Sequence, residues 1–179
     1  ITDFGFAPPT SSPSFSGLLR VNGIYLRNQI SYNVSYNTIT SSNVVGAGTL
    51  IGINHYANNA TFNFPATTST IKFNTIALKH NLAAAAVQGI AVGTLSGNVT
   101  TTIDILNNKF KQHPDGLPTV DNGAIDFIKN ENAAGTVSIS NNTFENLAVK
   151  VGTGTTTLIW NSNNTPDSNI QNNAIVGSF

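Results

Sequence analysis

Eight of the sixteen charged side chains of this chain (Lys+Arg 8, Asp+Glu 8) fall between Asp104 and Glu131. Carboxylates beside Lys or His can act as general acid and base on a saccharide, and carboxylate oxygens suit Ca²⁺. The same composition is also typical of a protruding loop whose charged side chains are solvated. We favour this simpler interpretation. The candidate binding residues are Asp104, Lys109, Lys111, His113, Asp115, Asp121 and Asp126, together with Tyr25 as an outward ring for stacking on a sugar.

Patterns that would specify a cofactor or a nucleophile are missing from the sequence. His55, His80 and His113 do not have metal-ligand spacing, and there is no cysteine. No Gly-rich phosphate loop or nucleophile elbow occurs. The sequence therefore predicts no cofactor, and Ca²⁺ is the one cation that its carboxylates would suit.

The composition excludes several classes of partner. The chain has 179 residues, 40% of them hydrophobic and only 9% charged, with a net charge of zero. A nucleic-acid surface needs clustered Lys and Arg, and no apolar run approaches the ~20 residues of a membrane span. A charge-poor, cysteine-free chain rich in Asn, Thr and Gly favours a secreted or cell-surface bacterial protein. We therefore expect no nucleic acid and no membrane insertion.

Five asparagines mark an internal repeat, at intervals of 37, 34, 34 and 31 residues. Each has an aliphatic residue three positions before it and a large apolar residue two positions after it, which predicts a solenoid of stacked rungs. We expect these asparagines to form an internal ladder at a sharp turn, where Asn tolerates the left-handed conformation. The alternative is a row of amides that binds sugar hydroxyls. The ladder residues are Asn37, Asn74, Asn108, Asn142 and Asn173.

A second motif alternates with the asparagines and has apolar residues two apart, the period of a strand with one buried face. Its copies are residues 23–26, 50–53, 89–92, 124–127 and 157–160. Side chains alternate between the two faces of a strand, so we expect Tyr25 to point outward and Trp160 to lie in the core. The aspartates of the charged stretch should lie in loops or on outward faces. With a third strand after each asparagine, the sequence predicts an all-β fold of parallel sheets.

The runs VSISNNTF (residues 137–144) and IDILNNKF (residues 103–110) resemble the repeats of right-handed parallel β-helix proteins. That superfamily includes pectate-lyase-like enzymes, phage tailspikes and large secreted bacterial surface proteins. The rung that holds residues 71–76, ahead of an alanine-rich loop, is most similar to the surface proteins. The resemblance covers residues 20–179 and implies a right-handed parallel β-helix of about five rungs of 31–37 residues.

The resemblance leaves two functions open. The first is a non-catalytic extracellular module of an adhesin-type surface protein, which displays loops or binds a glycan. The second is a fragment of a polysaccharide lyase or glycoside hydrolase. β-Helix lyases resemble one another in combining Ca²⁺-binding acids with an Arg or Lys base, but Arg20 and Arg27 lie far from the acids here. The paired Asp and Gly-His-Gly of polygalacturonase-type hydrolases do not occur either, so we favour the first function.

A weaker alternative is binding to ice or another crystal surface. The position after the ladder asparagine is Thr in three rungs, as Thr38, Thr75 and Thr143, but Lys109 and Ala174 interrupt this column. A regular face of hydroxyls would need an unbroken column. We therefore rank this function below the other two.

The chain divides into two parts by composition. We expect residues 1–20, which hold Pro8, Pro9 and Pro13, to form an extended segment or a partial rung. Residues 21–179 should form the β-helix, as part of a longer solenoid. Its open strand ends should then pair with flanking rungs or with a second copy.

Overall fold

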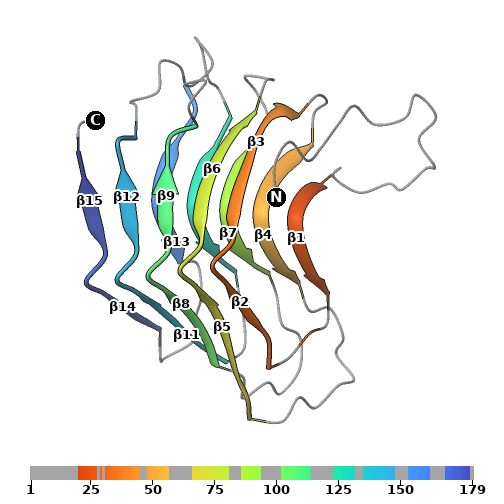
Figure 1. Cartoon of the computed structure of the whole chain (residues 1–179), viewed down its shortest axis with the longest axis vertical. Helices are drawn as coiled ribbons and strands as arrows, with labels where there is room; N and C mark the ends of the chain where they lie inside the picture. Colours follow the sequence, from red (N-terminus) through yellow and green to blue (C-terminus); the bar gives the residue numbers. More distant parts are fainter. Residues whose placement is uncertain are drawn as a thin grey trace, which may run out of the picture.

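The computed structural model describes residues 20–27, 29, 31–44, 48–56, 66–80, 86–93, 102–113, 123–131, 135–147, 153–161 and 168–177. Every regular element in these ranges is a β-strand, and all strand pairs are parallel. Successive rungs each contribute one strand to each of three sheets, so that the chain winds as a solenoid (Figure 1). The predicted parallel β-helix is confirmed.

The three sheets each contain five strands, in the order of the rungs. Sheet 1 holds β1 (Arg20–Arg27), β4 (Thr49–Tyr56), β7 (Val87–Val92), β10 (Ile125–Asn130) and β13 (Thr156–Asn161). Sheet 2 holds β2 (Asn33–Ser35), β5 (Thr68–Lys72), β8 (Thr102–Leu106), β11 (Thr136–Ser140) and β14 (Asn169–Gln171). Sheet 3 holds β3 (Thr38–Val44), β6 (Thr75–His80), β9 (Lys109–Lys111), β12 (Thr143–Glu145) and β15 (Ala174–Val176).

The core consists of the predicted apolar columns. In sheet 2 the column is Val34, Ile71, Ile105, Ile139 and Ile170, and in sheet 3 it is Ile39, Ile76, Phe110, Phe144 and Ile175. Phe110 and Phe144 stack with their ring centroids 5.1 Å apart, and Phe127 of sheet 1 meets both rings edge-on. The first four rungs therefore bury their column residues between the three sheets, which stabilises the solenoid, whereas Ile170 and Ile175 of the last rung are 44% and 53% exposed.

Sheet 1 departs from simple strand alternation. Phe127 and Ile128 are consecutive, yet both contact the core, as do Leu158 and Ile159. This pair of inward residues bends the sheet toward the core and makes its outer face concave (Figure 1). On the earlier rung the bend position is Gly89, where an added Cβ would lie 2.7 Å from the Phe110 ring and 2.4 Å from the Phe127 carbonyl oxygen. The side-chain parity after the bend is therefore shifted by one residue.

Candidate functional site

The ladder asparagines form a continuous internal hydrogen-bond chain, as predicted. The Asn108 main-chain N–H and Nδ2 both donate to Asn142 Oδ1, at 2.9 and 3.1 Å, and Nδ2 also donates to the Ile71 carbonyl at 2.8 Å. Asn74 makes the same bonds to Asn108, and Asn142 to Asn173. Asn74, Asn108 and Asn142 are at most 1% exposed. The ladder is structural, and a row of amides that binds sugars is the wrong interpretation.

The left-handed conformation does not fall on the ladder asparagine itself, which corrects the prediction. It falls on the residue just before, where φ is between 54° and 59° in all five rungs. We call these residues, which lie at the corner between sheets 2 and 3, the corner column. Two of its members are bulky aromatics, for which positive φ is unfavourable by about 1–2 kcal/mol. The corner column is Tyr36, Phe73, Asn107, Asn141 and Asn172.

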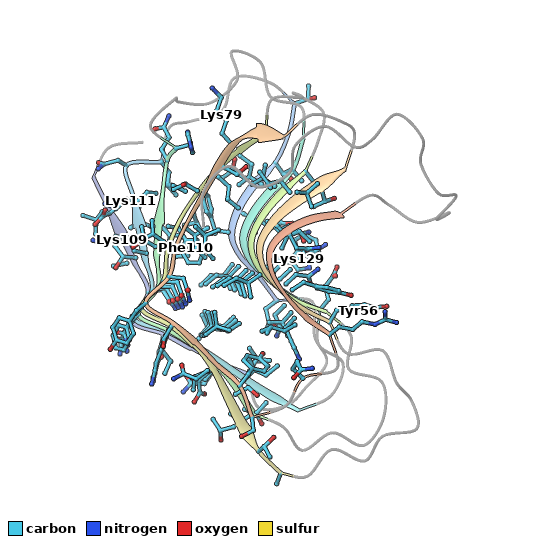
Figure 2. The ribbon with its side chains drawn as sticks, turned by 45° about the vertical axis from the view of Figure 1, so that its right-hand side comes forward. Tyr56, Lys79, Lys109, Phe110, Lys111 and Lys129 are labelled. Atoms are coloured by element: carbon cyan, nitrogen blue, oxygen red, sulfur yellow. The ribbon has the colours of Figure 1, made fainter. Side chains whose placement is uncertain are left out.

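The predicted charged patch is not one surface, because the winding of the rung separates its residues. Asp104 lies on sheet 2 and Asp126 on sheet 1, while Lys109 and Lys111 lie on sheet 3. Figure 2 shows Lys109 and Lys111 on one side of the coil and Lys129 on the other, with Phe110 in the interior between them. A stretch of one rung encircles the core, so proximity in sequence does not gather these side chains on one face.

On sheet 3 the charges form a small ion-pair cluster across two rungs. Glu145 Oε1 lies 2.8 Å from Lys109 Nζ, and Glu145 Oε2 lies 3.4 Å from Lys111 Nζ. The hydrogen bond from Lys109 is the largest cause that lowers the pKa of the Glu145 carboxyl, and Lys111 adds to it. The cluster borders a cavity of about 300 Å³ that is also lined by Gln112 and His113. The cluster therefore ties Lys109 and Lys111 of β9 to Glu145 of β12 in the next rung.

The other predicted residues of the patch differ in their surroundings. Asp104 lies on the outer side of sheet 2, as predicted, and partial burial raises the pKa of its carboxyl. His113 is buried rather than solvated, with 8% of its surface exposed. Asp115 and Asp121 lie outside the described residues. In the described chain these residues therefore do not converge on one ligand position.

The concave outer face of sheet 1 carries a hollow of about 230 Å³, which spans three rungs. Asp126 and Lys129 of β10 lie in it with Gln88 of β7 and Asn54 of β4. Asp126 was expected at an outward position and takes one, but the curvature of the sheet leaves only 8% of it exposed. Lys129 Nζ lies 2.8 Å from Glu131 Oε1 at the rim of the same hollow. We call this site the outer hollow; its lining is Thr49, Asn54, Ala86, Gln88, Ala91, Gly93, Ala124, Asp126, Lys129 and Glu131.

A column of outward side chains runs along this face. Tyr25 pairs in register with Asn54, Asn54 with Ala91, Ala91 with Lys129, and Lys129 with Trp160. Tyr25 is 49% exposed, as predicted, but Trp160 is 47% exposed and the prediction that it lies in the core is wrong. The physical reason is the inward pair that precedes it, which turns the next side chain outward. An aromatic ring thus stands at each end of the column.

Sequence reasoning did not single out the contact between His55, which is 1% exposed, and the partly buried Tyr32. The rings of Tyr32 and His55 are 5.1 Å apart, and His55 Nε2 lies 3.2 Å from the Gln29 carbonyl oxygen. Burial is the main cause that lowers the pKa of His55, and burial raises the pKa of Tyr32. In the part of the chain that the structure describes, His55 Nδ1 and Tyr32 Oη have no hydrogen-bond partner. The His55 ring and the Tyr32 hydroxyl are enclosed, so these polar atoms do not form an open binding surface.

Within the described ranges no group of three or more His, Asp or Glu side chains comes together as a metal site. Among the same residues there is also no helix long and apolar enough to cross a membrane. Comparisons with protein-family models, with curated proteins and with solved structures find no match to this chain. The candidate functional features of the described chain are therefore the outer hollow and the corner column.

Proposed function

We propose that this chain is a non-catalytic binding module of a secreted or cell-surface bacterial protein, and that it holds an oligosaccharide along the concave face of sheet 1. The observation that carries the proposal is the outer hollow, whose lining brings together Asp126 and Lys129 of β10 and Gln88 of β7. Asn54 of β4 also lines the hollow, but it is 2% exposed and its Nδ2 donates to Asn22 Oδ1 at 2.8 Å. Amide, carboxylate and ammonium groups match the many hydroxyls of a sugar as donors and acceptors.

The outward column supports an elongated ligand. Tyr25 and Trp160 are four rungs apart, which is about 19 Å at about 4.8 Å per rung. Aromatic rings at this separation, with polar side chains between them, suit a short oligosaccharide that runs parallel to the solenoid axis. Each ring would cover the apolar face of one sugar unit.

Hydrolysis at this face has weak geometric support. Asp126 and Glu131 both border the outer hollow but are five residues apart on the chain, about 16 Å of extended strand. Glycoside hydrolases place their two carboxyl groups about 5–9.5 Å apart. A polysaccharide lyase remains the alternative, because Lys129 lies in the same hollow as Asp126 and could serve as a base.

The test compares matched variants on different faces. We expect Asp126→Asn and Lys129→Ala to weaken oligosaccharide binding at least tenfold on a glycan array and in calorimetry. Asp104→Asn on sheet 2 and Lys109→Ala on sheet 3 should leave binding unchanged. Equal losses for both pairs would contradict a site on sheet 1. New reducing ends or unsaturated products from the wild type, lost in Lys129→Ala, would instead identify a hydrolase or lyase.

A further inference from the structure

The corner column carries an exposed aromatic pair that the core does not need. Tyr36 is 76% exposed and Phe73 is 41% exposed, and their rings stack with centroids 5.1 Å apart and planes inclined by 15°. Both residues have positive φ, at 59° and 56°. Large aromatics are thus held on the surface in a backbone conformation that they adopt rarely.

The backbone at this corner is fixed by the fold and not by the rings. The Tyr36 N–H donates to the Lys72 carbonyl at 3.3 Å, and the Phe73 N–H donates to the Leu106 carbonyl at 3.2 Å. Asn107 and Asn141 make the equivalent bond in later rungs with nearly the same φ. Since Asn satisfies this position with less strain, the rings at Tyr36 and Phe73 add strain, and the packing they gain is chiefly their stacking on each other. Strained aromatic residues that contact each other and remain exposed to solvent point to a function for the rings.

The residues on either side of the rings define the chemistry of a partner. Ser35 and Lys72 flank the pair on sheet 2, and Thr38 and Thr75 flank it on sheet 3. Lys72 is the single charged side chain among these four. Hydroxyl groups beside two stacked rings complement a sugar, which presents an apolar ring face edged by hydroxyls.

We propose that Tyr36 and Phe73 form a second saccharide-binding site, for a neutral sugar whose ring stacks on the exposed aromatic pair. Two rings edged by polar side chains are too small for a stable protein interface, which buries about 1,200–2,000 Å². The corner lies on the opposite side of the coil from sheet 1 (Figure 1). The site is therefore separate from the outer hollow and does not depend on the function proposed for it.

The test replaces the rings with the residue that later rungs use at the same position. A panel of neutral oligosaccharides of glucose, mannose, galactose and xylose is titrated onto the wild-type chain by calorimetry, with an oligogalacturonide as the acidic comparator. We expect at least one neutral member to bind, and the double variant Tyr36→Asn/Phe73→Asn to bind it at least tenfold more weakly. The double variant Tyr36→Phe/Phe73→Tyr keeps both rings and should retain the affinity, as should Lys129→Ala.

Stability and association separate a saccharide site from a purely structural role of the rings and from a contact between two copies. The Asn double variant should melt at the same temperature as the wild type or higher, because it relieves strain. A lower melting temperature with unchanged binding would show that the rings are structural and would overturn the proposal. Binding by no neutral member of the panel would also overturn it. So would a wild-type dimer in sedimentation that the Asn variant abolishes, because the rings would then contact a second copy.

Discussion

The ladder and the corner column lie one residue apart at the same turn, yet they follow different rules. The inner position holds Asn in every rung, because its side chain must donate and accept inside the core. The outer position is constrained only by its positive φ, so it holds Asn in three rungs and an aromatic ring in two. The corner column is restricted by backbone conformation alone, so its residues can be replaced for function. The ladder has obligatory buried hydrogen bonds, so its asparagines cannot.

Two neighbouring variants in one rung test whether the inner and outer positions differ in their contribution to stability. Asn108→Ala leaves the buried Asn74 N–H and the Ile71 carbonyl without their partner, so we expect unfolding to become easier by about 3 kcal/mol. The melting temperature should fall by about 6–12 °C. Asn107 is exposed, so Asn107→Ala removes no buried side-chain hydrogen bond and should cost only about 1 kcal/mol. Urea denaturation measures both, and similar losses would show that the two columns are equivalent.

A second variant tests whether strain is what limits the outer position. Asn141→Phe copies the residue of an earlier rung to a site with φ of 55°, where Asn107 and Asn172 offer no ring to stack against. We expect a loss of about 1 kcal/mol in urea denaturation, since a bulky residue is disfavoured at positive φ. Asn141→Gly is the control and should change stability by less than about 0.5 kcal/mol, because glycine adopts this conformation freely. A neutral or stabilising Asn141→Phe would disprove the strain argument.

The fold could be predicted from the sequence because each rung repeats the same chemistry. The apolar columns and the ladder asparagines recur at fixed offsets, and the registers Ile71–Ile105 and Ile105–Ile139 follow from them. The site could not be predicted in the same way. A rung encircles the core, so Lys109 and Asp126 reach different faces, and the inward pair Leu158–Ile159 reverses the parity expected for Trp160. Tyr36 and Phe73 directly precede ladder asparagines in the sequence, where the later rungs have Asn. This difference between rungs was the sequence signal that could have identified the aromatic pair.

Glu145, in the charged cluster that follows the ladder on sheet 3, carries a titratable carboxyl, whereas the ladder side chains are neutral amides. Lys109 and Lys111 lower the pKa of the folded Glu145 carboxyl from its ordinary value of 4.5. A depressed carboxyl pKa contributes stability above the unfolded pKa and loses it as the pH falls through the folded pKa. The ladder amides do not titrate, so their contribution should not change over this range.

We therefore expect Glu145→Gln to be less stable than the wild type at pH 7, with a small difference because the ion pairs are exposed and screened by solvent. The difference should shrink below about pH 4.5 and vanish once the wild-type carboxyl is protonated. It should also shrink at pH 7 in 1 M salt, where the screening length is about 3 Å. Asn108→Ala serves as the control, since its deficit should persist at both pH values and both salt concentrations. Urea denaturation at both pH values and both salt concentrations measures these differences in unfolding free energy. If the Glu145→Gln difference did not change with pH or with salt, packing and not charge would hold Glu145 between the two lysines.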